Sequence, residues 1–228
     1  SVTAIEQEKK ATFFIIDDSL LEKSGKTIEQ IGKVYDHCSH TYSIGMKLLT
    51  LGFWNGKSFI PLDFSIHNEP GKTGKRGLKK KDLDNQFTKE RTTDSAGYKR
   101  VKEVETDKIQ MSINLISNAL KRKICANYVL ADSWFVCEPF LIGIKSLTKA
   151  IDVIGLMKTN RIIEIKGQKH KASTIADLKR NEIHYCKSFK CHYISLVFTY
   201  KNIEMKGFWV RMKGQDSWKL LISTDKKL

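Results

Sequence analysis

Aspartates follow two widely separated apolar segments of this sequence. Asp17 and Asp18 come after residues 12–16, and Asp132 comes after residues 127–131. Carboxylates brought together from distant parts of a chain can hold Mg²⁺, which binds one or two of them together with waters and substrate phosphates. Two such ions about 4 Å apart can activate water or a 3′ hydroxyl for phosphodiester chemistry. An aspartate at a strand end is also a common turn former or helix cap, so the spacing alone leaves both interpretations open.

Both aspartate positions are expected at the ends of buried strands. Residues 12–18 combine aromatic and β-branched side chains and stop on the two acids, a pattern typical of a strand that ends at a carboxylate. Residues 127–132 repeat this pattern with a single acid at the end. Because successive side chains of a strand point to opposite faces, only one of Asp17 and Asp18 can point into a shared site, and the other should face away or cap the loop.

The chain between these strands predicts a loop, a hairpin and a helix. Residues 19–40 are polar and expected to be loop, and residues 42–54 and 59–66 should be strands joined at Asn55-Gly56. Thr106 can cap a helix with one buried stripe. The apolar positions of that stripe step by four, three, four and four residues: Ile109, Ile113, Ile116, Leu120 and Ile124.

The remaining segments complete an α/β order. Residues 138–147 predict a helix and residues 151–157 a strand, so the elements run in the order of a mixed sheet flanked by helices. Acids at the ends of separate strands would meet at one edge of such a sheet. Beyond residue 160 four successive strands are predicted instead, at residues 162–166, 192–200, 205–212 and 218–223. We therefore expect an α/β core over residues 1–160 and a β-rich module, inserted or appended, over residues 161–228.

The composition favours a polyanionic partner. The chain has 40 Lys and Arg against 25 Asp and Glu, a formal net charge of +15, and a sequence pI near 9.5. Nucleic acid is the leading candidate partner and an anionic membrane surface the second. No apolar run approaches the roughly 20 residues that span a bilayer, and the five cysteines form no disulfide framework. We expect a cytosolic protein with no membrane segment.

A basic segment lies between the predicted hairpin and the predicted helix. Residues 72–81 carry six Lys and Arg among ten positions. Five of these side chains are candidates for sequence-independent contacts with DNA phosphates: Lys75, Arg76, Lys79, Lys80 and Lys81. A solvated charge run is the alternative, because acidic residues follow closely.

Two further clusters have a functional and a structural interpretation. His184, Cys186, Cys191 and His192 offer the ligand types of tetrahedral zinc, although adjacent ligands on a strand are awkward for one ion. The aromatic side chains Tyr200, Phe208, Trp209 and Trp218 could stack on an unpaired base. A buried cysteine, a hydrogen-bonded histidine and core aromatics are the ordinary interpretations.

Five segments carry a resemblance to a known family. Residues 15–25, 35–37, 45–51, 61–64 and 129–135 resemble, in the right order, the DDE transposases of bacterial insertion sequences, of the insertion-sequence-four type. The resemblance covers most of residues 11–160. It implies an RNase H-like fold in which one catalytic Asp ends the first strand and another ends the fourth. It also implies a β-rich insertion before a final helix.

The resemblance assigns roles to the aspartates. It matches Asp132 to the second catalytic Asp and either Asp17 or Asp18 to the first, and we favour Asp18. It implies Mg²⁺, with Mn²⁺ as a substitute, held by Asp18 and Asp132. The implied activity is DNA strand cleavage and transfer at transposon ends, by a prokaryotic, nucleoid-associated protein that binds double-stranded terminal repeats. Family members act as dimers on paired ends, so a homodimer is also expected.

The third catalytic residue of that family is not found. It should be a Glu on a helix with the pattern Tyr-x2-Arg-x3-Glu-x6-Lys, which this sequence lacks. We therefore expect a chain truncated before that helix. The alternatives are a catalytically inactive DNA-binding remnant, and a nuclease unrelated to transposition.

Overall fold

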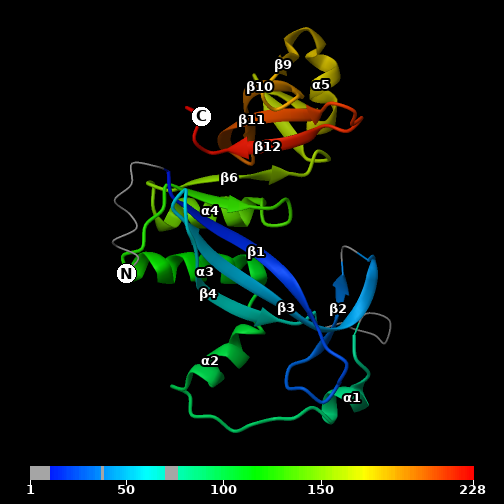
Figure 1. The fold of residues 1–228 in the computed structure, drawn as a ribbon, viewed down its shortest axis with the longest axis vertical. Coiled ribbons are helices and arrows are strands. Elements are labelled where there is room, and N and C mark those ends of the chain that lie inside the picture. Colours follow the sequence, from blue (N-terminus) through cyan, green and yellow to red (C-terminus); the bar gives the residue numbers. More distant parts are fainter. Residues whose placement is uncertain (1–10, 37–38, 70–76) are drawn as a thin grey trace. The chain divides into compact units, whose positions relative to one another are not determined.

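The computed structural model describes residues 11–36, 39–69 and 77–228 (Figure 1). The chain divides into two compact units. Of the described residues, those within Ile16–Gly52 and Phe59–Lys123 form the N-terminal unit, and residues 11–15 together with Phe53–Ser58 and Ile124–Leu228 form the C-terminal unit. Within the described ranges, twelve strands form a mixed sheet accompanied by helices. The predicted fold class, α/β with a mixed sheet flanked by helices, is confirmed, whereas the RNase H-like type remains a prediction.

Four antiparallel strands supply the sheet of the N-terminal unit. They are β1 (Phe13–Glu22), of which residues from 16 onward belong to this unit, β2 (Gly32–Asp36), β3 (Thr41–Trp54) and β4 (Phe59–His67). In this unit β3 borders β1, β2 and β4, and its register with β2 runs from Gly32↔Gly45 to Asp36↔Thr41. The long strand β3 therefore organises this part of the sheet.

The predicted turn at Asn55-Gly56 is confirmed. The Asn55 side-chain oxygen accepts hydrogen bonds from the backbone N–H groups of Lys57 at 2.9 Å and Ser58 at 2.7 Å. Gly56 has a φ of +89°, in the left-handed region that glycine tolerates without steric cost. The chain leaves this turn into β4, which begins at the predicted Phe59.

Two predictions for the same unit are wrong. β1 does not end at the aspartates but continues to Glu22, and β2 lies inside the predicted loop of residues 19–40. Pairing with β3 explains both differences, because a ladder partner supplies backbone hydrogen bonds whatever the local propensity. The Lys23 N–H, for example, still donates to the Ile44 carbonyl at 2.8 Å.

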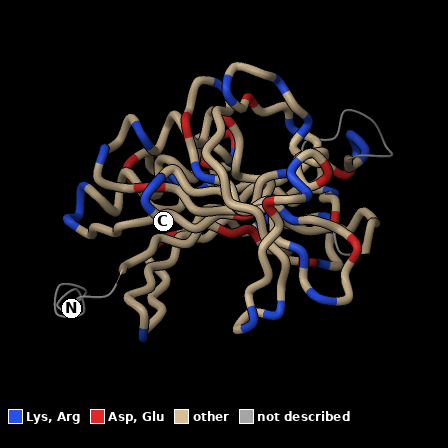
Figure 2. Tube along the Cα trace, turned by 90° about the horizontal axis from the view of Figure 1, so that it is seen from above, with Lys and Arg blue, Asp and Glu red and all other residues tan. Residues whose placement is uncertain are grey.

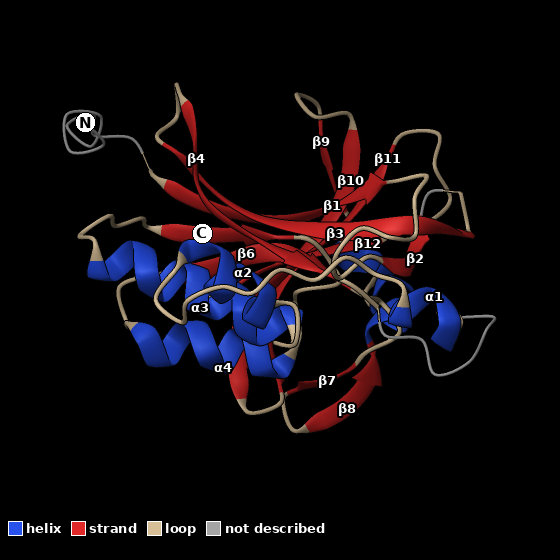
Figure 3. Cartoon of the chain, turned by 90° about the horizontal axis from the view of Figure 1, so that it is seen from below, coloured by secondary structure: helices blue, strands red, loops and turns tan. Residues whose placement is uncertain are grey.

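The helices of the N-terminal unit are α1 (Lys80–Asp84), α2 (Ala96–Glu103) and α3 (Lys108–Lys121). Both α2 and α3 contact β4, and Figure 3 shows both helices on one side of β1 and β3. The amphipathic helix α3 was predicted, and Ile113 and Ile116 of the predicted stripe are buried. The helix ends before Ile124, the last position of that stripe. Neither α1 nor α2 was predicted, because the sequence around them lacks apolar periodicity.

The cap of α3 differs from the prediction. Asp107, not Thr106, is the N-cap, and its Oδ1 accepts hydrogen bonds from the backbone N–H groups of Ile109 at 2.9 Å and Gln110 at 3.2 Å. A carboxylate at this position also interacts favourably with the helix dipole.

The C-terminal unit contains the second α/β segment. β5 (Tyr128–Ala131) and β6 (Asp152–Met157) pair in parallel, with α4 (Glu138–Leu147) in the connection between them. These three elements were predicted. The start of β1 is tied to the start of β5, because the Thr12 N–H donates to Asn127 Oδ1 at 2.8 Å.

The β-rich segment continues the sheet of this unit. Its strands are β7 (Ile162–Ile165), β8 (Gln168–Lys171), β9 (His184–Cys186), β10 (Cys191–Tyr200), β11 (Ile203–Met212) and β12 (Lys219–Ser223). The strand order is β5-β6-β12-β11-β10-β7-β8, with β9 paired to β10. β12 pairs antiparallel with β6, from Leu220↔Met157 to Ser223↔Ile154. Besides the four predicted strands, the segment contains β8, β9 and the short helix α5 (Ile175–Leu178). A division of the chain at residue 160 remains a prediction.

Replacing Asp107 with Ala should lower the free energy of unfolding by about 1 kcal/mol, because two N–H groups of the first turn of α3 lose their acceptor. Thr106→Ala is the matched control and should change this free energy by only a few tenths of a kcal/mol. Urea unfolding followed by circular dichroism measures both effects. Equal losses in the two variants would contradict the assignment of the cap.

Candidate functional site

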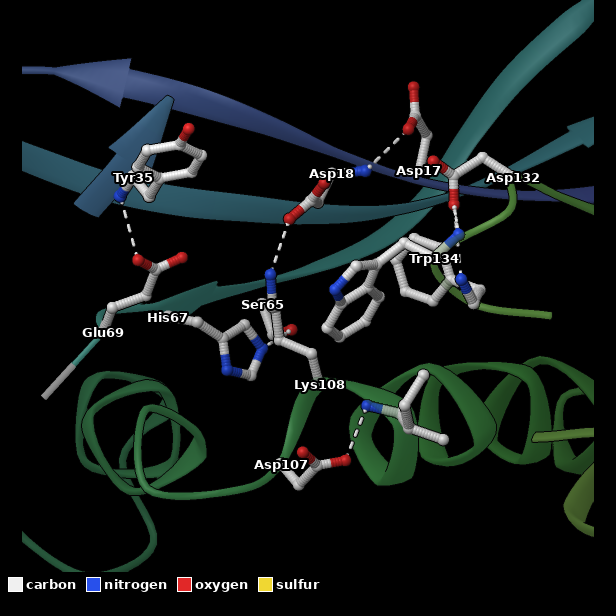
Figure 4. Close-up of polar contacts among 12 residues, drawn as sticks. Asp17, Asp18, Tyr35, Ser65, His67, Glu69, Asp107, Lys108, Asp132 and Trp134 are labelled. Carbon is white, nitrogen blue, oxygen red and sulfur yellow. Dashed lines mark hydrogen bonds and ion pairs between the residues drawn. The ribbon is translucent and has the colours of Figure 1, made fainter. Parts of the chain in front are cut away.

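Asp17 and Asp18 lie in the middle of β1 and face opposite sides of the strand. Asp18 is half-buried and shares its face with the buried Ile16, whereas Asp17 is exposed. Oδ1 of Asp17 accepts from the backbone N–H of the next residue, Asp18, at 2.9 Å (Figure 4). The expected opposite orientation of the two side chains is therefore present, although the expected strand end is not, and the choice of Asp18 as the ligand remains a prediction.

Asp18 forms an ion pair with a residue that the sequence did not point to. Lys108, the first residue of α3, places its Nζ 2.8 Å from Asp18 Oδ2 (Figure 4). The two side chains are only 17% and 24% exposed, so the pair is more sheltered from solvent than an ordinary surface salt bridge. A cation in the first turn of a helix is disfavoured by the helix dipole, and the Asp18 carboxylate compensates for that cost. A lysine so close to the start of a predicted helix is unusual, and this was the one feature of the sequence that could have drawn attention to Lys108.

A buried pair on β4 is affected by the charges of Asp18 and Lys108. Ser65 and His67 are buried, with Ser65 Oγ 2.8 Å from His67 Nε2 (Figure 4). Burial lowers the pKa of His67, and the charge of Lys108 lowers it further, whereas the Thr106 backbone and the charges of Asp107 and Asp18 act in the opposite direction. His67 is therefore held in its neutral form near neutral pH. Nothing in the sequence distinguished this histidine from a core residue.

Asp132 has a different environment in the C-terminal unit. It is exposed and directly follows β5. Its Oδ1 accepts from the backbone N–H groups of Trp134 at 2.8 Å and Phe135 at 3.3 Å (Figure 4). The carboxylate thus stabilises the turn after β5. This is the turn-forming role that the sequence left open as an alternative to metal binding. Only one of its two oxygens takes part in these bonds.

A glycine on the neighbouring strand fixes the backbone before Asp132. Gly155 of β6 is the register partner of Ala131. A Cβ atom on Gly155 would lie 2.5 Å from the Ala131 carbonyl oxygen and 2.6 Å from Val136 Cγ2. The absence of a side chain therefore lets β6 approach the end of β5 closely, and this approach holds the residue before Asp132 in place.

The carboxylates fit a hard divalent cation in their donor chemistry. Mg²⁺ prefers carboxylate oxygens, and within the described ranges Asp18 Oδ1 and Asp132 Oδ2 accept no side-chain or backbone hydrogen bond. Asp18 Oδ2 already binds the ammonium of Lys108, so this position accommodates positive charge. The described part of the chain contains no group of three or more His, Cys, Asp and Glu placed to share one ion.

The predicted basic residues are only partly described. Lys75 and Arg76 lie outside the described residues. Lys79, at the start of α1, and Lys80 and Lys81 within it are exposed, and none of the three forms an ion pair with another described residue. The nearby Asp82 instead pairs with Lys26, at 3.3 Å between Nζ and Oδ2. Elsewhere, Lys and Arg occur along most of the described chain, as Figure 2 shows.

The structure does not favour zinc at the His and Cys cluster. In the β9–β10 pair Cys186 faces Cys191, His184 faces Tyr193 and His192 faces Tyr185. Because side chains alternate along a strand, His184 lies on the face of the two cysteines and His192 on the opposite face. The two imidazoles therefore lie on opposite sides of the hairpin.

Trp209 is a core residue rather than a base-stacking platform. Its side chain is 0% exposed, and its indole N–H donates to the Ala172 carbonyl at 2.7 Å. Tyr200 is also buried. Phe208 and Trp218 are partly exposed, and each has a cation nearby: Lys206 Nζ lies 5.4 Å from the Phe208 ring centre and the Arg211 guanidinium 4.9 Å from that of Trp218.

The family model for DDE superfamily endonucleases matches residues 2–173, about three quarters of the chain. The chain belongs to this family. The matched range includes β1 with Asp18 and β5 with the following Asp132. The predicted resemblance to DDE transposases is thus confirmed at the level of the DDE superfamily, whereas the insertion-sequence-four type remains a prediction.

One similar solved structure is the cryo-EM structure of the piggyBac transposase synaptic complex with hairpin DNA. It is 11% identical in sequence with a TM-score of 0.42, and the alignment covers 98% of this chain and 35% of that protein. The chain therefore spans about a third of the length of that transposase. The search of curated proteins gives no match. Within the described residues, no helix is both long and apolar enough to cross a membrane.

Stability should decrease with falling pH because of His67. The pKa of its imidazole is lower in the folded state than its ordinary value of 6.5, so below about pH 6.5 the unfolded state binds more protons. The contribution to stability is complete above that pH and is lost as the pH falls toward the folded-state pKa, with a slope of up to about 1.4 kcal/mol per pH unit.

Urea unfolding of the wild type and of His67→Gln between pH 5 and 7.5 measures this contribution. The slope should be smaller in His67→Gln, and His184→Gln, which removes an exposed imidazole, is the matched control. The same slope in the wild type and His67→Gln would contradict a neutral, buried His67.

Proposed function

We propose that this protein is a transposase of the insertion-sequence type that cleaves and transfers DNA strands with divalent metal ions. Asp18 and Asp132 are the proposed metal ligands, with Mg²⁺ as the ion and Mn²⁺ as a substitute. The observation that carries this proposal is the match to DDE superfamily endonucleases over a range that contains both residues. DDE superfamily endonucleases generally use divalent metals, and oxygen ligands suit them.

The environments of the two aspartates support these roles. One carboxylate oxygen of Asp18 takes no part in the ion pair with Lys108. One carboxylate oxygen of Asp132 takes no part in the hydrogen bonds to the backbone of its turn. When bound, the ions would activate water or a 3′ hydroxyl and stabilise the leaving oxygen, so no covalent enzyme intermediate is required. The protein's own contribution is to hold the carboxylates, through Lys108 in one case and two backbone N–H groups in the other.

Double-stranded DNA is the proposed partner. The net charge of +15 favours binding through phosphate neutralisation, and Lys79, Lys80 and Lys81 are exposed with no ion pair to another described residue. Lys75 and Arg76 belong to the same proposed contact. The proposed protein recognises transposon terminal repeats and acts as a homodimer on paired ends.

A catalytically inactive, DNA-binding protein is the second candidate. One observation favours it: the described residues offer no third carboxylate grouped with Asp18 or Asp132. DNA binding is common to both candidates, so only a test of strand cleavage separates them.

Nicking of supercoiled DNA in the presence of Mn²⁺ separates the two candidates. Asp18→Asn and Asp132→Asn should each lower the nicking rate by at least about 100-fold, because each removes a charged metal ligand. Asp17→Asn is the matched control, since Asp17 faces the other side of β1, and should keep most of the activity. The same low background in the wild type and all three variants would support the inactive DNA-binding protein.

Replacing Lys108 with Gln should increase the affinity for Mn²⁺. The ammonium of Lys108 occupies Asp18 Oδ2 and competes with a metal ion there. A pair worth up to about 1 kcal/mol corresponds to a gain of about fivefold in affinity. Electron paramagnetic resonance of free Mn²⁺ measures it, with Lys81→Gln as a control for net charge. A loss of affinity in Lys108→Gln would show that Lys108 supports the ion instead.

A further inference from the structure

A groove of about 470 Å³ lies between α2 and α3 in the N-terminal unit. It involves none of the residues assigned above to metal or DNA. Residues of both helices line it, and both helices contact β4. The lining side chains important here are two lysines of α2, three polar residues of α3 and one buried methionine of α3: Lys99, Lys102, Asn114, Asn118, Lys121 and Met111.

The helical period explains why these side chains share one surface. Lys99 and Lys102 are three residues apart, and Asn114, Asn118 and Lys121 follow at intervals of four and three, so each set forms one stripe. The opposite face of α3 is buried in the unit. The polar stripe of α3 is therefore directed into the groove by the burial of its apolar face.

The groove presents mainly hydrogen-bond donors. A lysine ammonium can only donate, and the Asn114 side-chain oxygen already accepts from Gln110 Nε2 at 3.0 Å, which leaves the Asn114 amide group as a donor. Glu103, the acid in the lining, accepts from Arg100 Nη1 at 2.9 Å, so its charge is compensated. Among the described residues, Lys102 pairs only with Glu105, at 3.7 Å between two well-exposed side chains, which is a weak interaction.

Several contacts hold the α2 wall of the groove in place. Arg100 Nη2 donates to Asp63 Oδ1 at 2.7 Å, its Nη1 donates to the Phe64 carbonyl, and its guanidinium lies 4.5 Å from the centre of the Phe64 ring. Ser95 Oγ caps α2 by accepting from the Tyr98 N–H at 3.2 Å. Arg100 thus anchors α2 to β4, and a surface that is already ordered loses less entropy when it binds a ligand.

We infer that this groove binds the phosphodiester backbone of double-stranded DNA. Lysine and asparagine side chains are typical phosphate contacts, which carry no sequence information. From Asn114 to Lys121 the stripe is seven residues long, or about 10 Å of helix. One DNA strand has a phosphate about every 3.4 Å of duplex axis and also winds around that axis, so this length can reach more than one successive phosphate, unlike a site for one small anion. The inference rests on the proposed function for the choice of DNA and adds a second contact surface, on the helices.

The test is the salt dependence of duplex binding by the full chain. The triple variant Lys99→Gln, Lys102→Gln, Lys121→Gln is compared with the wild type by fluorescence anisotropy on a labelled random-sequence duplex from 50 to 200 mM salt. Each lost phosphate contact lowers the slope of log K against log salt by about 0.9, so the slope should fall by about 2 to 3. Binding at low salt should weaken by at least about tenfold.

Two further variants separate the groove from general charge. Lys166→Gln, Lys169→Gln, Lys171→Gln makes the same change in charge on exposed residues at β8 and the turn before it, and should keep nearly the wild-type slope. Asn114→Leu with Asn118→Leu removes donors without changing charge and should weaken binding severalfold while the slope stays nearly constant. Circular dichroism and urea unfolding confirm that each variant is folded.

The outcomes distinguish the groove from the proposed function. Equal effects of the two lysine triples overturn the inference, because net charge alone would then explain binding. If the wild type binds, Lys79→Gln, Lys80→Gln, Lys81→Gln weakens binding and the groove triple does not, the inference fails while DNA as the partner stands. Failure of the wild type to bind duplex DNA overturns both.

Discussion

The ion pair between Asp18 and Lys108 is the constraint on which the N-terminal unit depends. Strand alternation places Asp18 on the same face of β1 as the buried Ile16, where a carboxylate needs a compensating charge. Lys108 supplies it from the first residue of α3, a position that the helix dipole disfavours without such a partner. The Asp107 cap fixes the adjoining turn, and the charge of Lys108 helps to keep His67 neutral. One pair therefore links β1, α3 and the buried part of β4.

The charges of Asp18 and Asp132 are compensated in different ways, and this difference affects the proposed metal binding. Asp18 is half-buried and holds an ammonium, so a metal ion there has to compete with a tethered cation. Asp132 is exposed, and two backbone N–H groups hold one of its oxygens while the other takes no part. A carboxylate that forms a turn can thus remain available as a ligand. The structural and the functional interpretations of Asp132 are compatible.

Positive charge in the N-terminal unit is organised by the helices as well as by the basic segment. The sequence drew attention to the run of lysines before α1, yet α2 and α3 place separate lysines and amides on one groove. Arg100 contributes indirectly, because it anchors α2 and compensates Glu103. In the C-terminal unit the β-rich strands extend the sheet through the pairing of β12 with β6, rather than forming a sheet of their own.

The sequence by itself determined the elements whose signals are local. The hydrophobic period of α3, the Asn55-Gly56 turn, the strand β5 and the opposite orientations of Asp17 and Asp18 all arise from neighbouring residues and the period of a helix or strand. The tertiary structure alone decided how far β1 extends, that β2 pairs with β3, that Asp107 is the cap, and that Lys108 is the partner of Asp18. These features depend on hydrogen bonds and charges between residues far apart in the chain. Asp18 and Lys108 are 90 positions apart, and no local sequence pattern predicts such a contact.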